Sequence, residues 1–336
     1  MMTCIGTPIE VIDCASSVVP ESIYGSDSPV VLKGLISYWP VVEKGLQSNQ
    51  AAVEYLNGLY NKQPVNAFMA EPESKGRIFY NEQVDGFNFV QSNVYLDDAL
   101  NKILEIADAE NNPTYYIGSL EINHHLPRFC ETNDLALKYA NARKSIWLGN
   151  QSVVAPHFDF PDNIACCIIG ERRFTLFPPE QHDNLYVGPL DLTPAGQPIS
   201  MVNIDEPDLA MYPKYSEAVA AARSAILTPG DAIYIPSMWW HSVKSLSALN
   251  GLVNYWWRET PAYMGAPNNA LLHAMLSIKE LPERQRKVWQ NMFMRYIFEQ
   301  PDDLYDHLPA DCKNKQGQLS EITAQRLRAY LVNKLK

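Results

Sequence analysis

Short apolar segments separated by turn residues dominate the middle of the chain. Between Thr114 and Trp257, six runs of β-branched, aromatic and aliphatic residues are typical of strands: Tyr115–Ile117, Ser145–Leu148, Ile164–Ile169, Arg173–Phe177, Ala232–Ile235 and Leu252–Trp257. Turn residues at Pro178-Pro179, Pro198 and Pro229-Gly230 punctuate them. Because no helical pattern alternates with these strands, we expect an antiparallel sandwich or barrel.

Elements of another kind precede this β-rich region. The apolar run Pro29–Leu35 is followed by two amphipathic segments, Ala51–Tyr60 and Leu96–Ala109, whose spacing predicts helices that cover a sheet. We therefore expect residues 1–265 to form one unit, with a cover in about 1–112 and a β core in about 113–265.

Helical spacing returns after Pro267 and predicts a separate helical region over residues 266–336. Its expected helices are Ala270–Ile278, Glu283–Phe298 and Glu321–Lys336. Apolar residues recur on one face, as Leu327, Leu331 and Leu335 do at intervals of four. Such a stripe either packs on its own core or forms an interface between two copies, and the pattern allows both interpretations.

Composition and charge narrow the class of protein. The chain has 336 residues, of which 46% are hydrophobic, and its net charge of −11 repels nucleic-acid backbones and anionic lipid surfaces. No stretch approaches the roughly 18 apolar residues that a membrane span requires, and no leader pattern is present. We therefore expect a cytoplasmic protein with neither nucleic-acid nor membrane partners. Its six cysteines lack C-x-x-C spacing, which favours a reducing compartment: Cys4, Cys14, Cys130, Cys166, Cys167 and Cys312.

Candidate chemistry begins in the motif P-H-F-D. Residues two apart in a strand project from the same face, so His157 and Asp159 can present an imidazole and a carboxylate to one point. His241 follows the strand Ala232–Ile235, and we expect neighbouring barrel strands to bring it to His157. Two histidines and one carboxylate form the facial triad that holds Fe(II) with open positions for oxygen chemistry. No Cys or His at suitable spacing offers the fourth ligand of a structural zinc site.

Two adjacent arginines, Arg172 and Arg173, open the apolar run that ends at Phe177. Charged side chains are seldom buried without a partner, so we expect one of them to turn inward and meet an anion. Neighbouring residues of a regular strand point to opposite faces, so only one can do so. The spacing from His157 favours Arg172.

These residues belong to four longer motifs: P-H-F-D, I-I-G-E-R-R-F-T-L-F-P-P, L-T-P-G-D-A-I-Y-I-P-S-M-W-W-H and G-L-V-N-Y-W-W. Together the motifs resemble the JmjC-type, cupin-like Fe(II)/2-oxoglutarate-dependent oxygenases, in particular the subgroup that contains the asparaginyl hydroxylase factor inhibiting hypoxia-inducible factor. The resemblance implies a mainly β fold, a double-stranded β-helix of the jelly-roll type with helical cover, N-terminal α/β elements and a C-terminal helical extension. It also implies an iron bound by His157, Asp159 and His241, with 2-oxoglutarate and dioxygen as cosubstrates.

The resemblance extends to the residues around 2-oxoglutarate, with two departures. Arg172 stands where the subgroup usually has a lysine that pairs with the distal carboxylate, and Val154 stands where relatives commonly have Thr or Ser. A guanidinium keeps the charge and can bind a carboxylate through two donors, but it is not equivalent to lysine. Ser152 is a candidate replacement for the missing hydroxyl.

Four further positions match the pocket of the family. Tyr116 matches the tyrosine that completes the carboxylate site, although Tyr115 leaves the register open. Asn163, Asn254 and Trp256 match positions around the cosubstrate and the iron. An amide within an apolar strand, as at Asn254, needs hydrogen-bond partners of its own.

The subgroup implies hydroxylation of a C–H bond in an amino-acid side chain of a protein or peptide, with a homodimer formed through the C-terminal helices. A small-molecule substrate is the main alternative. Two segments rich in aromatic residues, Gly76–Phe89 and Glu180–Ser224, are the candidate substrate walls. Two other classes stay open: a metal-dependent cupin enzyme that ignores 2-oxoglutarate, and a binding protein that has lost turnover.

Overall fold

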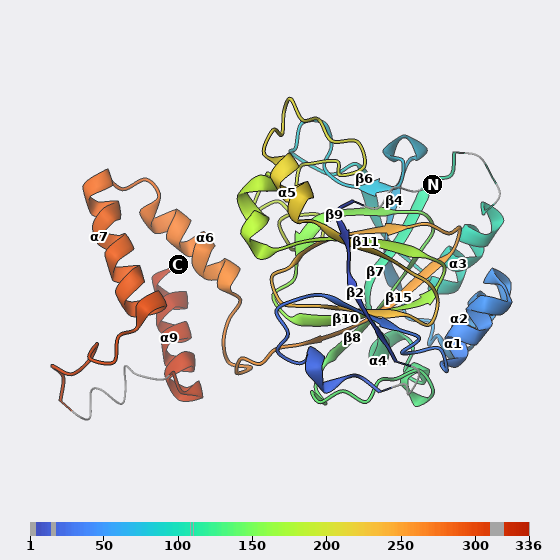
Figure 1. Cartoon of the computed structure of the whole chain (residues 1–336), viewed down its shortest axis with the longest axis horizontal. Coiled ribbons are helices and arrows are strands. Elements are labelled where there is room, and N and C mark those ends of the chain that lie inside the picture. The colour runs from blue at the N-terminus through green and yellow to red at the C-terminus, as the bar shows by residue number, and fades with distance from the viewer. Residues whose placement is uncertain (1–4, 15–17, 108, 110, 310–318, 336) are drawn as a thin grey trace. The chain divides into compact units, whose positions relative to one another are not determined.

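Two β-sheets packed against each other form the centre of a unit that ends at Arg258 (Figure 1). The computed structural model describes residues 5–14, 18–107, 109, 111–309 and 319–335. Cys4, Cys312 and Lys336, which entered the sequence predictions, lie outside the described residues. A second unit begins at Glu259 and is described separately below.

The smaller sheet has six strands. In spatial order they are β1 (Thr7–Pro8), β12 (Arg223–Leu227), β11 (Arg172–Phe177), β14 (Trp240–Ser245), β9 (Val153–Phe158) and β5 (Arg77–Ile78). The larger sheet has nine strands. They are β2 (Glu10–Asp13), β3 (Val30–Lys33), β13 (Ala232–Ile235), β10 (Asp162–Ile169), β15 (Asn250–Trp257), β8 (Arg143–Gly149), β7 (Thr114–Glu121), β4 (Val65–Ala70) and β6 (Phe89–Val94).

The eight strands from β8 to β15 pass between the two sheets as a double-stranded β-helix. β8, β15, β10 and β13 are neighbours in the larger sheet, and β9, β14, β11 and β12 are neighbours in the smaller one. All pairs within these two sets are antiparallel. The predicted fold class is confirmed. The sequence did not predict β12, because Arg223 and Ser224 were assigned to the long loop, yet they pair with Leu176 and Thr175 of β11.

Apolar side chains from both sheets fill the interior of the β-helix. Cys167 belongs to this interior cluster, together with Phe174, Leu176 and Ile233. Its neighbour Cys166 points to the other face of β10 and packs under the helical cover. The alternation of a strand therefore divides one apolar run between two cores.

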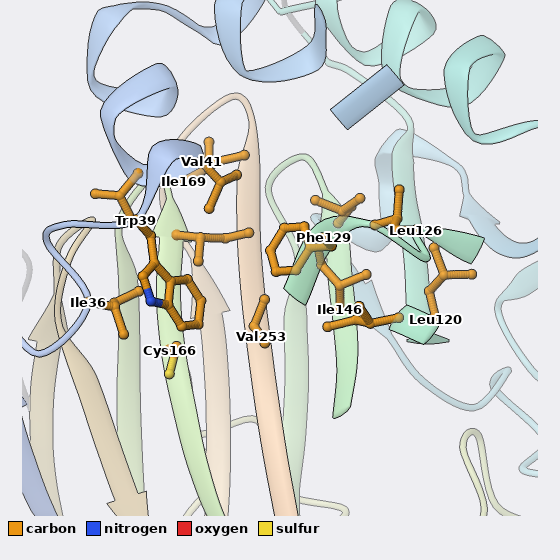
Figure 2. Packing of buried hydrophobic residues seen from close by; sticks show 14 of the residues in the cluster. Ile36, Trp39, Val41, Leu120, Leu126, Phe129, Ile146, Cys166, Ile169 and Val253 are labelled. Carbon is orange, nitrogen blue, oxygen red and sulfur yellow. The ribbon is translucent and has the colours of Figure 1, made fainter. Parts of the chain in front are cut away.

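Helices cover the outer face of the larger sheet. They are α1 (Pro40–Gln47), α2 (Asn49–Leu59), α3 (Leu96–Glu105) and α4 (Ile122–His125), with the 3₁₀ turns η1 (Glu21–Ile23), η2 (Pro72–Ser74) and η3 (Phe129–Glu131). Figure 2 shows Trp39 between this cover and the sheet, near Val253 and Phe129. Its ring meets that of Phe129 edge-on at 6.3 Å. The segment after β11 holds η4 (Pro179–Asn184) and α5 (Tyr215–Ala221).

The second unit consists of helices with exposed apolar side chains. They are α6 (Pro267–Ile278), α7 (Glu283–Phe293), the π-helical segment η5 (Met294–Glu299) and α9 (Glu321–Lys334). No residue of these four elements is buried. None of the helices in the described part of the chain is both long and apolar enough to span a membrane.

The T-P-G-D turn before β13 fixes the β-helix to strand β3. Gly230 has a φ of +104°, and a Cβ atom there would lie 2.6 Å from the hydroxyl of Ser37, so glycine is required. The Asp231 carboxylate accepts hydrogen bonds from the backbone of Gly34, from Lys33 Nζ and from Thr228. Burial raises its pKa, but these donors outweigh burial and hold the pKa of Asp231 below its usual range.

We predict that Asp231→Asn lowers the free energy of unfolding at pH 7 by about 2 kcal/mol, because charge-assisted hydrogen bonds are lost. The folded-state pKa lies below the unfolded value of about 3.9, so the contribution is present above about pH 4 and disappears as pH falls through the folded pKa. Urea unfolding of both proteins along an acid series measures it. A difference that stays constant down to the lowest pH would contradict the prediction.

Candidate functional site

His157, Asp159 and His241 converge at one end of the β-helix interior. His157 on β9 and His241 on β14 are direct cross-strand partners, and their ring centroids lie 4.2 Å apart. Asp159 lies just beyond β9, which ends at Phe158, so it is a loop residue rather than the predicted strand residue. His241 Nε2 is 3.8 Å from Asp159 Oδ2, and the three ligand atoms all lie within 4.8 Å of one another. Among the described residues, no other group of His, Cys, Asp and Glu has this arrangement.

Each histidine ring is oriented by a backbone carbonyl two residues before it. His157 Nδ1 lies 2.9 Å from the carbonyl oxygen of Ala155, and His241 Nδ1 lies 3.0 Å from that of Trp239. A ring that donates from Nδ1 keeps Nε2 unprotonated and able to bind a metal. Both histidines therefore direct the same kind of lone pair into the site.

Asp159 is held by its side chain and by its backbone. Trp256 Nε1 donates to Asp159 Oδ2 at 3.1 Å, and the Met238 backbone N–H donates to the Asp159 carbonyl at 2.9 Å. Met238 adopts a φ of +68°, a conformation that a long side chain tolerates only where its surroundings impose it. The turn before β14 thus positions the carboxylate as well as His241.

The triad faces a cavity of about 110 Å³ inside the β-helix. Arg172 lines the cavity and is only 3% exposed. Arg173 points to the outer face of the sheet, where it forms an ion pair with Asp205, which Lys244 also contacts at 2.8 Å. The alternation of β11 therefore assigns the inward position to Arg172.

Arg172 is a buried cation without a counter-ion. Its Nε has no hydrogen-bond partner, and no carboxylate within the described ranges forms an ion pair with the guanidinium. Burial lowers the pKa of Arg172 from its ordinary value. A buried charge in this position is costly unless an anion accompanies it.

The remaining sequence-predicted residues surround the same cavity. Tyr116 lines it, whereas Tyr115 packs with the core under the helices, so Tyr116 is the tyrosine that faces the site. Asn254 Nδ2 donates to Asn163 Oδ1 at 2.9 Å, and the Asn254 Oδ1 atom is buried without a partner. Both amides and Trp256 also line the cavity.

The two departures from the family pattern have different surroundings. Val154 lines the cavity with an apolar side chain. Ser152, the candidate replacement, lies outside the cavity lining, and its hydroxyl is 3.2 Å from that of Ser245. Ser245 is the cross-strand partner of Arg172. Ser152 is therefore connected to the strand position of Arg172 only through Ser245.

The predicted substrate walls contribute through residues that the sequence did not single out. Ile78 comes from the first segment, and the second supplies a roof of Pro194, Ala195, Gln197 and Ile199. The aromatic residues of both segments pack in clusters behind this lining. Only the folded structure shows which residues of these segments line the cavity and which support the lining from behind, because burial is a property of the folded chain. No sequence pattern marks Gln197.

Comparison with known proteins agrees with this geometry. The model of the family described as "Cupin-like domain" matches residues 15–263, about three quarters of the chain. The chain belongs to this cupin-like family. The match contains all eight strands of the β-helix and every residue of the candidate site.

Curated relatives of this cupin-like chain carry several names. JmjC domain-containing protein D of Dictyostelium discoideum is 25% identical over 239 residues, 66% of this chain and 49% of its own length. Lysine-specific demethylase 8 of Xenopus tropicalis is 25% identical over 68% of this chain and 48% of its own length. Human tRNA wybutosine-synthesizing protein 5 is 31% identical over 42% of this chain and 46% of its own length. The chain thus matches about half the length of each relative.

His241 makes the stability of the metal-free cupin-like domain sensitive to acid. Burial first, and then repulsion from His157, lowers its pKa to about 4. The unfolded value is about 6.5, so the unfolded chain binds more protons between these pH values, and stability rises with pH across that window. We predict that His241→Gln flattens this rise. Urea unfolding in the presence of a chelator at several pH values measures the slope of stability against pH for the wild type and for His241→Gln. Equal slopes would contradict the assignment of this pH dependence to His241.

Proposed function

We propose that the chain is an Fe(II)- and 2-oxoglutarate-dependent oxygenase. The observation that carries this proposal is the placement of a His-Asp-His triad and an unpaired, buried arginine on one cavity. A metal ligand set alone fits many cupin enzymes. A dicarboxylate cosubstrate also requires, in the same cavity, a positively charged side chain that has no other anionic partner.

The triad fits iron through the chemistry of its donors. Two imidazole Nε2 atoms and one carboxylate form the facial set of non-haem Fe(II) oxygenases, which leaves coordination positions open. Both rings have their Nδ1 atoms occupied by carbonyls, and Asp159 is fixed by the indole of Trp256. Such outer contacts hold ligands in the orientation that a metal needs.

Arg172 fits the distal carboxylate of 2-oxoglutarate. Its guanidinium presents several donors in one plane, which suits a carboxylate, and its Nε is unsatisfied. Tyr116 lies beside it in the cavity lining, and its hydroxyl stays protonated because burial raises the pKa of Tyr116. Asn254 and Asn163 place a hydrogen-bonded amide pair at the same cavity.

Iron and 2-oxoglutarate, when bound, would activate dioxygen: one oxygen atom would enter the C–H bond of the substrate, and the other would enter succinate as the ketoacid loses carbon dioxide. The tasks of the protein are to bind, to orient and to exclude water. Arg172 and Tyr116 fix the cosubstrate, the triad fixes the metal, and the apolar lining around Phe174 and Leu252 keeps the site dry.

The charges of the cavity favour an uncharged target group. Asp159 is the one carboxylate among its lining residues in the described chain, and it belongs to the triad. A lysine ammonium bound in this cavity would lose its hydration without gaining a counter-ion, which is energetically unfavourable. We therefore propose hydroxylation of an uncharged amino-acid side chain of a protein or peptide. A small uncharged metabolite is the alternative substrate class.

One observation favours a second candidate. Val154 removes a hydroxyl that relatives direct at the carboxylate, and Ser152 does not reach the cavity to replace it. A metal-dependent cupin protein that does not use 2-oxoglutarate would need no such donor. Ligand binding decides between the two.

We predict that anaerobic addition of Fe(II) and then 2-oxoglutarate to the chain produces the visible charge-transfer band of a chelated ketoacid. Asp159→Ala should abolish iron binding, because a facial triad cannot form from two ligands. Arg172→Met should retain iron and weaken 2-oxoglutarate binding by at least tenfold, since the buried anion loses its charged partner.

Arg172→Lys is the matched control, because it keeps the charge without the planar donor set. It should bind 2-oxoglutarate more tightly than Arg172→Met. Iron binding by the wild type without the band would support the metal-dependent cupin candidate that does not use 2-oxoglutarate. Equal 2-oxoglutarate affinity in Arg172→Met and the wild type would assign the anchor elsewhere.

We also propose that the second unit forms a homodimer interface. Large apolar side chains of α7 and η5 are exposed, among them Trp289, Met292 and Ile297, and the α9 residues Leu327 and Leu331 are exposed as well. A helical unit with so little buried surface needs a partner to cover it. A second copy of the chain supplies the same apolar faces.

The predicted test is sedimentation of the full chain beside a chain truncated after Pro267. The full chain should sediment as a dimer at micromolar concentration and the truncated chain as a monomer, because the apolar helices are removed. A monomeric full chain at that concentration would refute the homodimer.

A further inference from the structure

The strand that carries His157 contains a β-bulge immediately before this ligand. His241 pairs with His157 and Val243 pairs with Val154, so the single residue Ser242 of β14 faces both Ala155 and Pro156 of β9. The extra residue shifts, by one position, the alternation of side chains between the two faces of β9. Val154 and His157 both line the cavity, although residues three apart in a regular strand point to opposite faces.

The bulge also contributes a direct contact to the ligand. The carbonyl of Ala155, one of its two residues, is the acceptor for His157 Nδ1. Pro156 has no N–H to donate, and an inner strand accepts proline mainly at such an irregularity. The bulge thus determines that the His157 side chain points into the cavity and that its Nδ1 atom carries the proton.

Two serines hold the bulge from opposite sides. From the neighbouring strand β14, the Ser242 hydroxyl donates to the Val154 carbonyl at 2.7 Å. The Ser200 backbone N–H donates to the Pro156 carbonyl at 2.8 Å, from the roof of the cavity. Ser200 follows Ile199, which forms a bridge with His157 and lines the cavity.

We propose that Ser242 and the Ser200 amide are positioning groups that keep the Ala155–Pro156 bulge in place, and that this bulge couples the cavity roof to the metal ligand His157. The proposal rests on the metal-binding function proposed above. Neither Ser242 nor Ser200 lines the cavity, so each acts through the bulge. A substrate that contacts Ile199 is then connected to His157 by one short backbone segment.

The test compares Co(II) binding by full-length variants, using a competing chelator for the dissociation constant and the visible Co(II) spectrum for ligand geometry. Ser242→Ala should raise the dissociation constant about tenfold and change the spectrum, as loss of an outer-shell partner does. Ser242→Thr keeps the hydroxyl and should restore both. The matched control is Ser224→Ala, since the Ser224 hydroxyl also donates to a backbone carbonyl, that of Ile5 at 2.7 Å, away from the bulge.

Hydrogen exchange of the wild-type protein tests the roof contact without a mutation. Coupling is reciprocal, so Co(II) should slow exchange of the Ser200 amide several-fold. The comparison amide is that of Ser245, which donates to the Ser152 carbonyl at 2.8 Å beyond the other end of β9 and should change less.

Each outcome decides the inference. Wild-type affinity and spectrum in Ser242→Ala, or an equal Co(II)-induced change in exchange at the Ser200 and Ser245 amides, would overturn it while leaving the metal site intact. A wild type that binds no Co(II) would overturn the proposed function and this inference together. If Ser242→Ala does not fold, the exchange comparison decides alone.

Discussion

The cross-strand pair of His157 and His241 is the constraint on which the site depends. These residues are opposite one another only in the observed register of β9 and β14, and a shift of one residue would turn a ligand away from the cavity. Their neighbours Phe158 and Trp240 are also directly opposite and pack on the outer face, with ring centroids 4.9 Å apart. The same register thus serves the site on one face and a core on the other.

Charge burial explains the second half of the site. Arg172 and Arg173 are both almost fully buried, but only Arg173 has a carboxylate, Asp205, beside it. The fold therefore neutralises one cation within the chain and leaves the other for a ligand. Because the unpaired cation lies inside the β-helix, an anion that joins it enters the cavity that the triad faces.

Periodicity predicted an antiparallel sandwich or barrel and five of the eight strands of the β-helix, because a chain that buries both faces of a sheet needs runs such as Ile164–Ile169. The family resemblance implied the double-stranded β-helix itself. Periodicity did not find β12, whose Arg223 and Ile226 are not buried, since a strand of mixed polarity has no distinctive local pattern. The helix expected from Leu96 to Ala109 ends at Glu105, and that expected to Phe298 becomes π-helical after Phe293. Element ends depend on contacts that periodicity does not describe.

The sequence alone identified the candidate site residues, because imidazole, carboxylate and guanidinium groups are identifiable by type and by motif spacing. It also limited the inward position to one of two arginines, since adjacent strand residues face apart. Tertiary structure decided the rest. It placed Asp159 in a loop, brought Pro194–Ile199 over the cavity, and inserted the bulge that turns Val154 and His157 to one face. These features arise from pairing between segments far apart in the chain, and local sequence does not encode such pairing.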